Sequence, residues 1–163
     1  MQVADHSASA INAAGQTWKL LQFHFHSPSE HSFDGKLMDL ELHLVHQNER
    51  GELAVVGLLF QKGKENKALA QVFDKMPSEV TGEPDGDVRA AVDLASVIPS
   101  APSYFTYMGS LTTPKCSENV HWFVLAPIAQ VSEAQLEKFR SVTHTATNRP
   151  VQPLGDRKVS RPF

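Results

Sequence analysis

The chain has 163 residues and a formal net charge of −3, from 15 lysines and arginines against 18 acidic residues. This length is enough for one domain with a substantial core, so we expect a single domain over residues 1–163. No basic stripe is present, which argues against a nucleic-acid partner, and no run of about 18 apolar residues predicts a membrane span. Residues 1–14 lack the basic start and apolar block of a signal peptide.

The first predicted strand carries two histidines in alternation. In residues 20–26, with the sequence LLQFHFH, every second side chain of a strand points to the same face. His24 and His26 then share a face with Leu20 and Gln22, and the phenylalanines take the other face. The two imidazoles lie about 6.6 Å apart along such a strand, which is close enough for both to bind one ion.

A second predicted strand carries a third histidine. Residues 38–46, with the sequence MDLELHLVH, place Glu41 and His43 on one face and His46 on the other. The connection between the two strands contains a turn signal at residues 34–35, so we expect the strands to pair antiparallel and to bring the three histidines together. Three imidazoles with an open fourth position are typical of a catalytic zinc site, whereas a structural zinc takes four protein ligands and the chain has one cysteine.

Two polar residues accompany these histidines at alternate positions of the same strands. Gln22 precedes His24 by two residues, and Glu41 precedes His43 by two residues. A carboxylate or amide behind each imidazole fixes its tautomer in zinc sites, and we predict this role for both residues. The predicted metal ligands are therefore His24, His26 and His43, with Gln22 and Glu41 as their hydrogen-bond partners.

The remaining apolar patterns predict further strands and two or three helices. Residues 53–60 are a continuous apolar run typical of a central strand, and residues 120–126 form another buried strand. Residues 66–76 have apolar side chains on one helical face, and residues 132–140 begin with a capping box. Residues 88–97 fit a short helix or a turn. We expect a mainly β (α+β) fold, with a large, mostly antiparallel twisted β-sheet and a few peripheral helices.

The run QFHFH-x-PSEH followed by ELHLVH resembles the α-class carbonic anhydrases of bacterial type. The likeness covers nearly the whole chain, including the Thr-Thr-Pro loop at residues 112–114 and the segment at residues 148–154. It implies a Zn²⁺ cofactor on the three histidines and the reversible hydration of carbon dioxide to bicarbonate and a proton by zinc-bound hydroxide. It also implies that His31 and His46 are not ligands and that sulfonamides inhibit.

The same resemblance assigns further site residues. Thr112 is expected to accept a hydrogen bond from the zinc hydroxide and to donate its own proton to an ionised Glu30. An apolar pocket for carbon dioxide is expected from Val45, Val55, Leu111, Val120 and Trp122. Only Val45 has independent support, because it shares a strand face with His43.

The resemblance also implies that the N-terminal segment of the family is missing, so the sheet is expected to be incomplete on that side. The proton-shuttle histidine of the family falls in that segment, and this chain is expected to have none. Cys116 matches a cysteine that secreted and periplasmic members pair with one near the N-terminus, so a periplasmic or secreted full-length protein is expected. A homodimer is left open.

Three different interpretations of the motifs remain compatible with the sequence. His24-x-His26-x-x-x-Glu30 also fits the metal motif of a cupin-type barrel, in which Glu30 is a ligand and the metal is often iron or manganese. The second histidine motif of the cupins is not found downstream. The chain also fits a non-catalytic binding module of the same fold, or a truncated domain that binds zinc with little activity.

Overall fold

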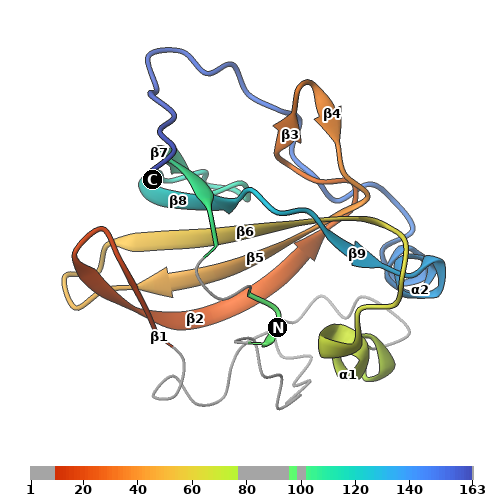
Figure 1. Ribbon diagram of the computed structural model, residues 1–163. Helices are drawn as coiled ribbons and strands as arrows, with labels where there is room; N and C mark the ends of the chain where they lie inside the picture. Colours follow the sequence, from red (N-terminus) through yellow and green to blue (C-terminus); the bar gives the residue numbers. More distant parts are fainter. Residues whose placement is uncertain (1–9, 77–95, 99–101, 163) are drawn as a thin grey trace.

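The main sheet of the protein is mixed and has seven strands, as the computed structural model of residues 10–76, 96–98 and 102–162 shows (Figure 1). In order across the sheet the strands are β1 (Ala10–Ala13), β2 (Gln16–His26), β5 (Leu40–Gln47), β6 (Leu53–Lys62), β8 (Glu118–Leu125) and β7 (Tyr104–Ser110), and β9 (Ala129–Val131) also pairs with β6. The pairs of β6 with β8 and with β9 are parallel, and the other pairs are antiparallel. The predicted mostly antiparallel sheet is confirmed, with β6 as its central strand.

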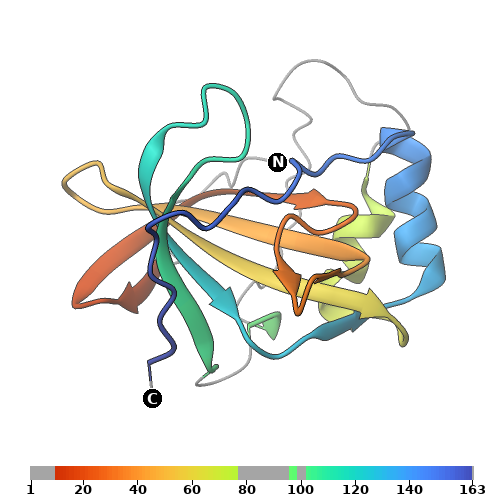
Figure 2. The same ribbon diagram turned by 90° about the horizontal axis from the view of Figure 1, so that it is seen from above.

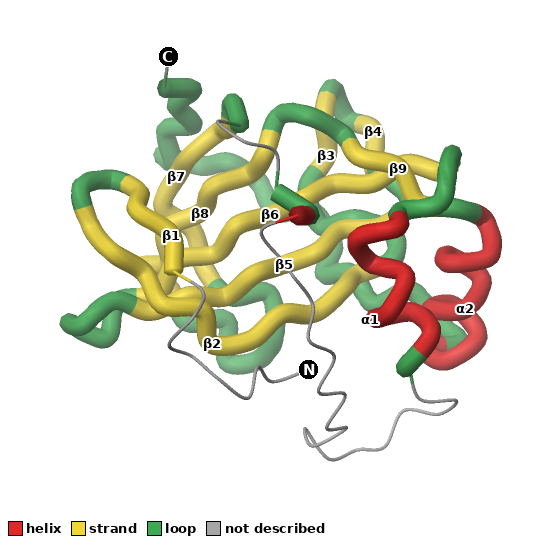
Figure 3. The backbone as a smooth tube through the Cα atoms, turned by 60° about the horizontal axis from the view of Figure 1, so that its bottom comes forward, coloured by secondary structure: helices red, strands yellow, loops and turns green. Residues whose placement is uncertain are grey.

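Smaller elements flank the main sheet. They are the hairpin of β3 (Ser32–Phe33) and β4 (Lys36–Leu37), the 3-10 helix η1 (Lys67–Leu69), and the helices α1 (Ala70–Asp74) and α2 (Glu133–Thr143). The two helices lie at the same end of the sheet (Figures 1 and 3). No helix among the described residues is long and apolar enough to cross a membrane.

The sheet separates two apolar clusters of different size. The side chains of β5 alternate between the two faces of the sheet as predicted. Leu40, Leu42 and Leu44 lie in the larger cluster, and Val45 lies in the smaller one. Both helices pack against the larger cluster. The smaller cluster consists of Val45, Val55, Leu59, Val120, Trp122 and Val124. Its face is the one that carries Glu41 and His43, because these side chains alternate with the leucines of β5.

The alternation of β2 is interrupted by a bulge. Leu20 lies opposite His46 while Gln22 lies opposite Val45, so Leu21 is an extra residue in this strand. Leu20 is consequently buried in the larger cluster, 2% exposed. The prediction that Leu20 shares the face of the histidines was therefore wrong, because one inserted residue reverses the faces of everything before it.

The two predicted helices are present with different lengths. Over residues 66–76 the chain forms η1 and α1, so the α-helical part is shorter than predicted. The predicted capping box at α2 is confirmed, since Gln135 N donates to Ser132 Oγ (3.2 Å) and Ser132 N donates to Gln135 Oε1 (3.0 Å). This helix ends at Thr143 rather than at about residue 140. Residues 88–95 of the predicted short helix or turn lie outside the described residues.

The chain beyond α2 returns across the sheet without regular secondary structure. Figure 2 shows this C-terminal segment, residues 144–162, passing over the strands toward β7. Near its beginning Thr147 N donates to Ser27 O (3.0 Å), and near its end Ser160 forms an isolated bridge with Thr106. The sequence contained no local signal for this path, which places the segment beside the predicted metal site.

Candidate metal centre

The three predicted metal ligands lie together on the face of β2 and β5. The strand register sets His24 directly opposite His43, and His26 follows two residues along β2. One ring nitrogen from each histidine lies within 4.8 Å of the other two. The ring centroids are 4.7 to 5.2 Å apart. Antiparallel pairing of the two strands therefore produces the cluster that the sequence predicted.

Each imidazole uses one ring nitrogen for a hydrogen bond to an oxygen acceptor. His24 Nδ1 donates to Gln22 Oε1 (2.8 Å), His26 Nδ1 donates to the backbone oxygen of Thr147 (2.8 Å), and His43 Nε2 donates to Glu41 Oε1 (2.9 Å). Because these nitrogens carry protons, the other nitrogen of each ring has a free lone pair. The predicted partners Gln22 and Glu41 are present, and Thr147 was missed because a backbone carbonyl has no sequence signature.

The protonation and burial of these rings fit a metal ion. Burial, followed by the neighbouring histidines, lowers the pKa of His24 to about 3, and burial also lowers the pKa of His26. These two imidazoles are therefore neutral, which is the state that binds metals. His26 Nε2 is buried without a hydrogen-bond partner among the described residues. Burying an unpaired polar atom costs free energy unless the atom binds a metal ion or another partner. A donor set of three imidazoles suits zinc.

Glu41 is a fully buried carboxylate whose oxygens are fully used. Its Oε2 accepts from the backbone nitrogens of Glu30 (2.8 Å) and His31 (2.9 Å). Its Oε1 accepts from His31 Nδ1 (2.6 Å) and His43 Nε2 (2.9 Å). Burial would raise the pKa of Glu41, but its contacts with the two histidines hold it well below the usual range. His31, Glu41 and His43 also have metal-like spacing, yet their atoms already satisfy one another by hydrogen bonding.

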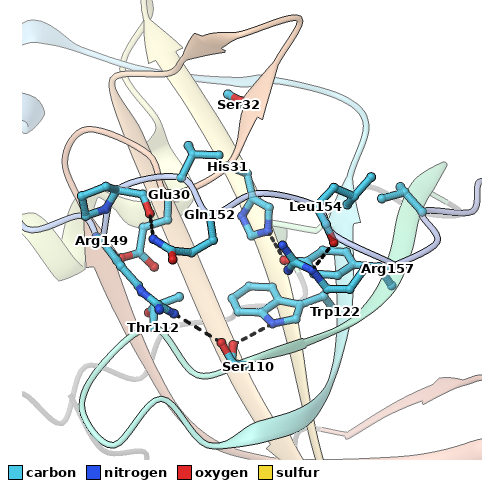
Figure 4. A pocket seen from close by; sticks show the side chains of 14 residues that line it. Glu30, His31, Ser32, Ser110, Thr112, Trp122, Arg149, Gln152, Leu154 and Arg157 are labelled. Carbon is cyan, nitrogen blue, oxygen red and sulfur yellow. Dashed lines mark hydrogen bonds between the residues drawn. The ribbon is translucent and has the colours of Figure 1, made fainter.

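Glu30 is buried, 8% exposed, at the edge of this cluster. Its Oε1 accepts from the backbone nitrogen of Arg149 (2.6 Å), and its Oε2 has no hydrogen-bond partner among the described residues. Glu30 and Thr112 line the same pocket (Figure 4). The predicted hydrogen bond from Thr112 is not formed in this structure, because Oε2, the oxygen that could accept it, is unpartnered. The role of Thr112 stays a prediction.

The five residues predicted for the substrate pocket meet in one place. Val45, Val55, Val120 and Trp122 belong to the smaller apolar cluster, and Leu111 packs against it. The Trp122 ring lies 4.9 Å from the His43 ring, centroid to centroid. The apolar cluster therefore adjoins the histidines directly. Its use as a site for carbon dioxide stays a prediction.

Two other histidines lie away from the cluster, and for His46 this was predicted. His46 is buried on the opposite side of β5, where its Nδ1 donates to Leu44 O (2.8 Å). His121 packs its ring against Trp18, with the centroids 5.4 Å apart. Neither residue contributes to the group of histidines that has metal-like spacing within the described part of the chain.

A cavity of about 190 Å³ lies beside the metal centre, between β8, β7 and the C-terminal segment. Figure 4 shows His31, Trp122, Arg149 and Arg157 around it, with Glu30 at one side. Sequence analysis did not single out His31 or Arg149 as part of the site. His31 Nε2 forms a hydrogen bond with the Tyr107 hydroxyl, 76 residues away along the chain, and no local sequence pattern predicts such a contact.

Comparison with known proteins agrees with these features. The profile of the eukaryotic-type carbonic anhydrase family matches residues 1–163. A carbonic anhydrase of Pectobacterium atrosepticum is 41% identical over 159 residues, which make up 98% of this chain and 64% of that relative. A carbonic anhydrase of a Nostoc species is 46% identical over 160 residues, or 98% of this chain and 60% of the relative. The chain thus spans about three fifths of the length of these relatives.

A solved structure shows the same fold. The α-carbonic anhydrase of Thermovibrio ammonificans, in complex with the inhibitor sulfanilamide, has a TM-score of 0.85 at 43% identity, over 93% of this chain and 66% of that chain. The sheet order, the histidine pairing across β2 and β5 and the match over all residues lead to one assignment. The chain belongs to the eukaryotic-type, or α-class, carbonic anhydrase family.

Proposed function

We propose that the protein catalyses the zinc-dependent, reversible hydration of carbon dioxide to bicarbonate and a proton. The observation that carries this proposal is the convergence of three imidazoles whose outer nitrogens are held by Gln22, Thr147 and Glu41. The zinc ligands are then His24 Nε2, His26 Nε2 and His43 Nδ1. As established for carbonic anhydrases, zinc on three histidines lowers the pKa of its bound water to about 7 and so supplies a hydroxide nucleophile.

The other residues of the site hold protons and exclude water. Glu41 keeps a negative charge behind His43 and makes that imidazole a stronger donor. Glu30 Oε2 is the acceptor available to the Thr112 hydroxyl, which then directs its own lone pair into the site. The adjoining valines and Trp122 offer an apolar surface, which suits a substrate that has no charge and no dipole.

The cupin interpretation no longer stands. The chain matches the carbonic anhydrase family over its whole length, and the main sheet of the described residues is open and mixed rather than a closed barrel. A non-catalytic module and a weakly active zinc-binding domain are both outcomes that the following experiments distinguish.

The first prediction concerns zinc content. The purified chain should bind about one zinc ion with high affinity, and His43→Ala should lose tight binding because two imidazoles rarely suffice. His46→Leu is the control, since His46 is equally buried in β5 but faces the other cluster. Zinc is measured by atomic emission after dialysis, with folding checked by circular dichroism. Stoichiometric zinc in folded His43→Ala would show that the ligand assignment is wrong.

The same zinc-loaded chain is assayed for hydration of carbon dioxide by stopped flow, with and without sulfanilamide. We expect hydration above the rate of free zinc and inhibition by the sulfonamide. Full zinc occupancy at the three histidines without hydration would reject the catalytic proposal and favour a non-catalytic zinc domain.

A further inference from the structure

We propose that Tyr107 is a positioning residue for the metal centre and that Arg157 of the C-terminal segment holds it in place. The effect of Tyr107 reaches the ligand His43 through His31 and Glu41. This inference rests on the proposed zinc binding at the three histidines, and it assigns a role to residues outside the proposed ligand set.

A continuous line of hydrogen bonds joins Tyr107 to the ligand. The Tyr107 hydroxyl lies 2.7 Å from His31 Nε2, and His31 Nδ1 lies 2.6 Å from Glu41 Oε1. The same Glu41 oxygen accepts from His43 Nε2 at 2.9 Å. His31 and the ligand His43 therefore depend on one oxygen atom, so a change in one hydrogen bond alters the geometry available to the other.

The direction of each hydrogen bond follows from the chemistry of the groups. An ionised Glu41 can only accept, so His31 Nδ1 must carry a proton. When His31 carries its proton on Nδ1 alone, its Nε2 has a lone pair, and the Tyr107 hydroxyl donates to it. Burial raises the pKa of Tyr107 well above its ordinary value, so the hydroxyl keeps its proton at working pH. For a singly protonated His31, only one arrangement of protons is consistent along the whole line.

The Tyr107 ring is held from several sides. The Arg157 guanidinium carbon lies 5.6 Å from the ring centroid, and the Trp122 ring is nearly parallel to it at 6.2 Å. Gly109 leaves the necessary room, because a Cβ atom there would lie 2.7 Å from Tyr107 Cε2. Arg157 itself donates to Leu154 O (2.9 Å) and Pro153 O (2.6 Å), which fixes its guanidinium to the C-terminal segment (Figure 4).

The same segment supports two other parts of the site. The backbone oxygen of Thr147 accepts from the ligand His26, and the backbone nitrogen of Arg149 donates to Glu30. With Arg157 included, one irregular stretch of chain orients the metal centre at three separate points. A positioning role for Arg157 therefore extends a pattern that its neighbours in the segment already follow.

Tyr107→Phe tests the inference, because it removes the hydroxyl and keeps the ring. The matched control is Tyr104→Phe on the same strand, whose ring packs on Phe123. We expect zinc affinity, measured by competition with a chelator, to fall by about 10- to 100-fold in Tyr107→Phe and to stay unchanged in the control. The visible absorption spectrum of the cobalt(II)-substituted chain should also change, since it reports ligand geometry directly.

A double-mutant cycle tests the route through His31. If Tyr107 acts through His31, then Tyr107→Phe has little further effect on zinc affinity in a His31→Gln background. Additive losses would overturn the proposed route. Arg157→Met, which keeps aliphatic packing but removes the cation, should weaken zinc binding in the same direction and provides the test if Tyr107→Phe does not fold.

Two failures are distinguishable. Unchanged zinc affinity and an unchanged cobalt spectrum in Tyr107→Phe, or in Arg157→Met if the first variant is unfolded, would overturn the positioning role and leave the proposed function intact. Absence of zinc binding by the unmodified chain would instead overturn the proposed function on which the inference rests.

Discussion

At the level of single residues, three imidazoles of the same kind obtain their orientation from three different acceptors. His24 uses an amide oxygen, His26 a backbone carbonyl and His43 a carboxylate. Only the third acceptor is charged, so His43 is the ligand whose donor strength depends most on its partner. Glu30 lies outside this set, although its Oε2 is 3.9 Å from His43 Nδ1.

Glu30→Gln distinguishes an orienting carboxylate from a metal ligand. We expect zinc to remain bound while hydration falls by about 100-fold, the scale of losing one group that positions a reacting partner. The physical reason is that a glutamine amide turned toward Thr112 donates a hydrogen bond where the carboxylate accepts. Stopped-flow hydration and zinc content are compared with those of Glu118→Gln, an exposed glutamate of β8. Loss of zinc from Glu30→Gln would identify Glu30 as a ligand.

At the level of elements, β6 supports the metal centre although it contributes no ligand. Gly57 of β6 lies directly opposite His43 of β5. A Cβ atom at this position would be 2.9 Å from Glu41 Oε1, the oxygen shared by two histidines. A glycine is therefore required in an otherwise apolar strand, because any side chain would displace a carboxylate that is held by four hydrogen bonds.

Gly57→Ala should consequently weaken zinc binding by about 10-fold or more, the usual cost of disturbing an outer partner of a ligand. Val56→Ile is the matched control, since it also adds one carbon to β6 but on the face of the larger cluster. Zinc affinity is measured by chelator competition, and thermal unfolding of both variants is compared. Equal zinc affinity in Gly57→Ala and the unmodified chain would show that Glu41 accommodates the added methyl group without losing its contacts.

At the level of the whole molecule, burial of His46 beside the larger apolar cluster makes the free energy of unfolding decrease at acidic pH. His46 is 2% exposed beside this cluster, and burial lowers its pKa to about 4. The unfolded chain binds this proton near the ordinary pKa of about 6.5. As pH falls from 6.5 to 4 the unfolded state takes up the proton first, so the fold loses about 1.4 kcal/mol of stability per pH unit over that window.

His46→Leu removes this titration. Between pH 7 and pH 5 the variant should lose about 2 kcal/mol less of its unfolding free energy than the unmodified chain, the product of about 1.5 pH units and the slope for one proton. Urea titrations are performed on the zinc-free protein, so that release of zinc does not contribute. The same pH dependence in both proteins would show that His46 titrates normally.

The sequence predicted those parts of the site that depend on local periodicity. The alternation of β2 and β5 identified His24, His26 and His43, because each strand is half of a regular ladder. The same rule failed for Leu20, since the bulge at Leu21 is not encoded by a period of two. Periodicity therefore located the three clustered histidines, but it did not assign every side chain to the correct face of the sheet.

The remaining parts of the site depend on contacts that cannot be predicted from residue type. Thr147 O and Arg149 N are backbone groups that almost any residue supplies, and each meets a partner about 120 residues away. Cys116 is a free cysteine in this structure, so the export predicted from it stays a prediction. The tertiary packing of the chain, rather than its amino-acid composition, determines these contacts.

The distance along the chain between ligands and their orienting groups has a consequence for biosynthesis. His26 leaves the ribosome 121 residues before the carbonyl of Thr147 that fixes its tautomer. A nascent chain that already displays the three histidines therefore presents a His26 ring without its distant acceptor, whereas the acceptors of His24 and His43 lie two residues away in the same strands. Such a ring holds a metal ion weakly, because the cost of ordering it is not yet met. Under the proposed zinc binding, tight loading with metal is expected only after residues 144–162 have folded over the sheet, and a nick within this segment is expected to weaken the site without altering a ligand.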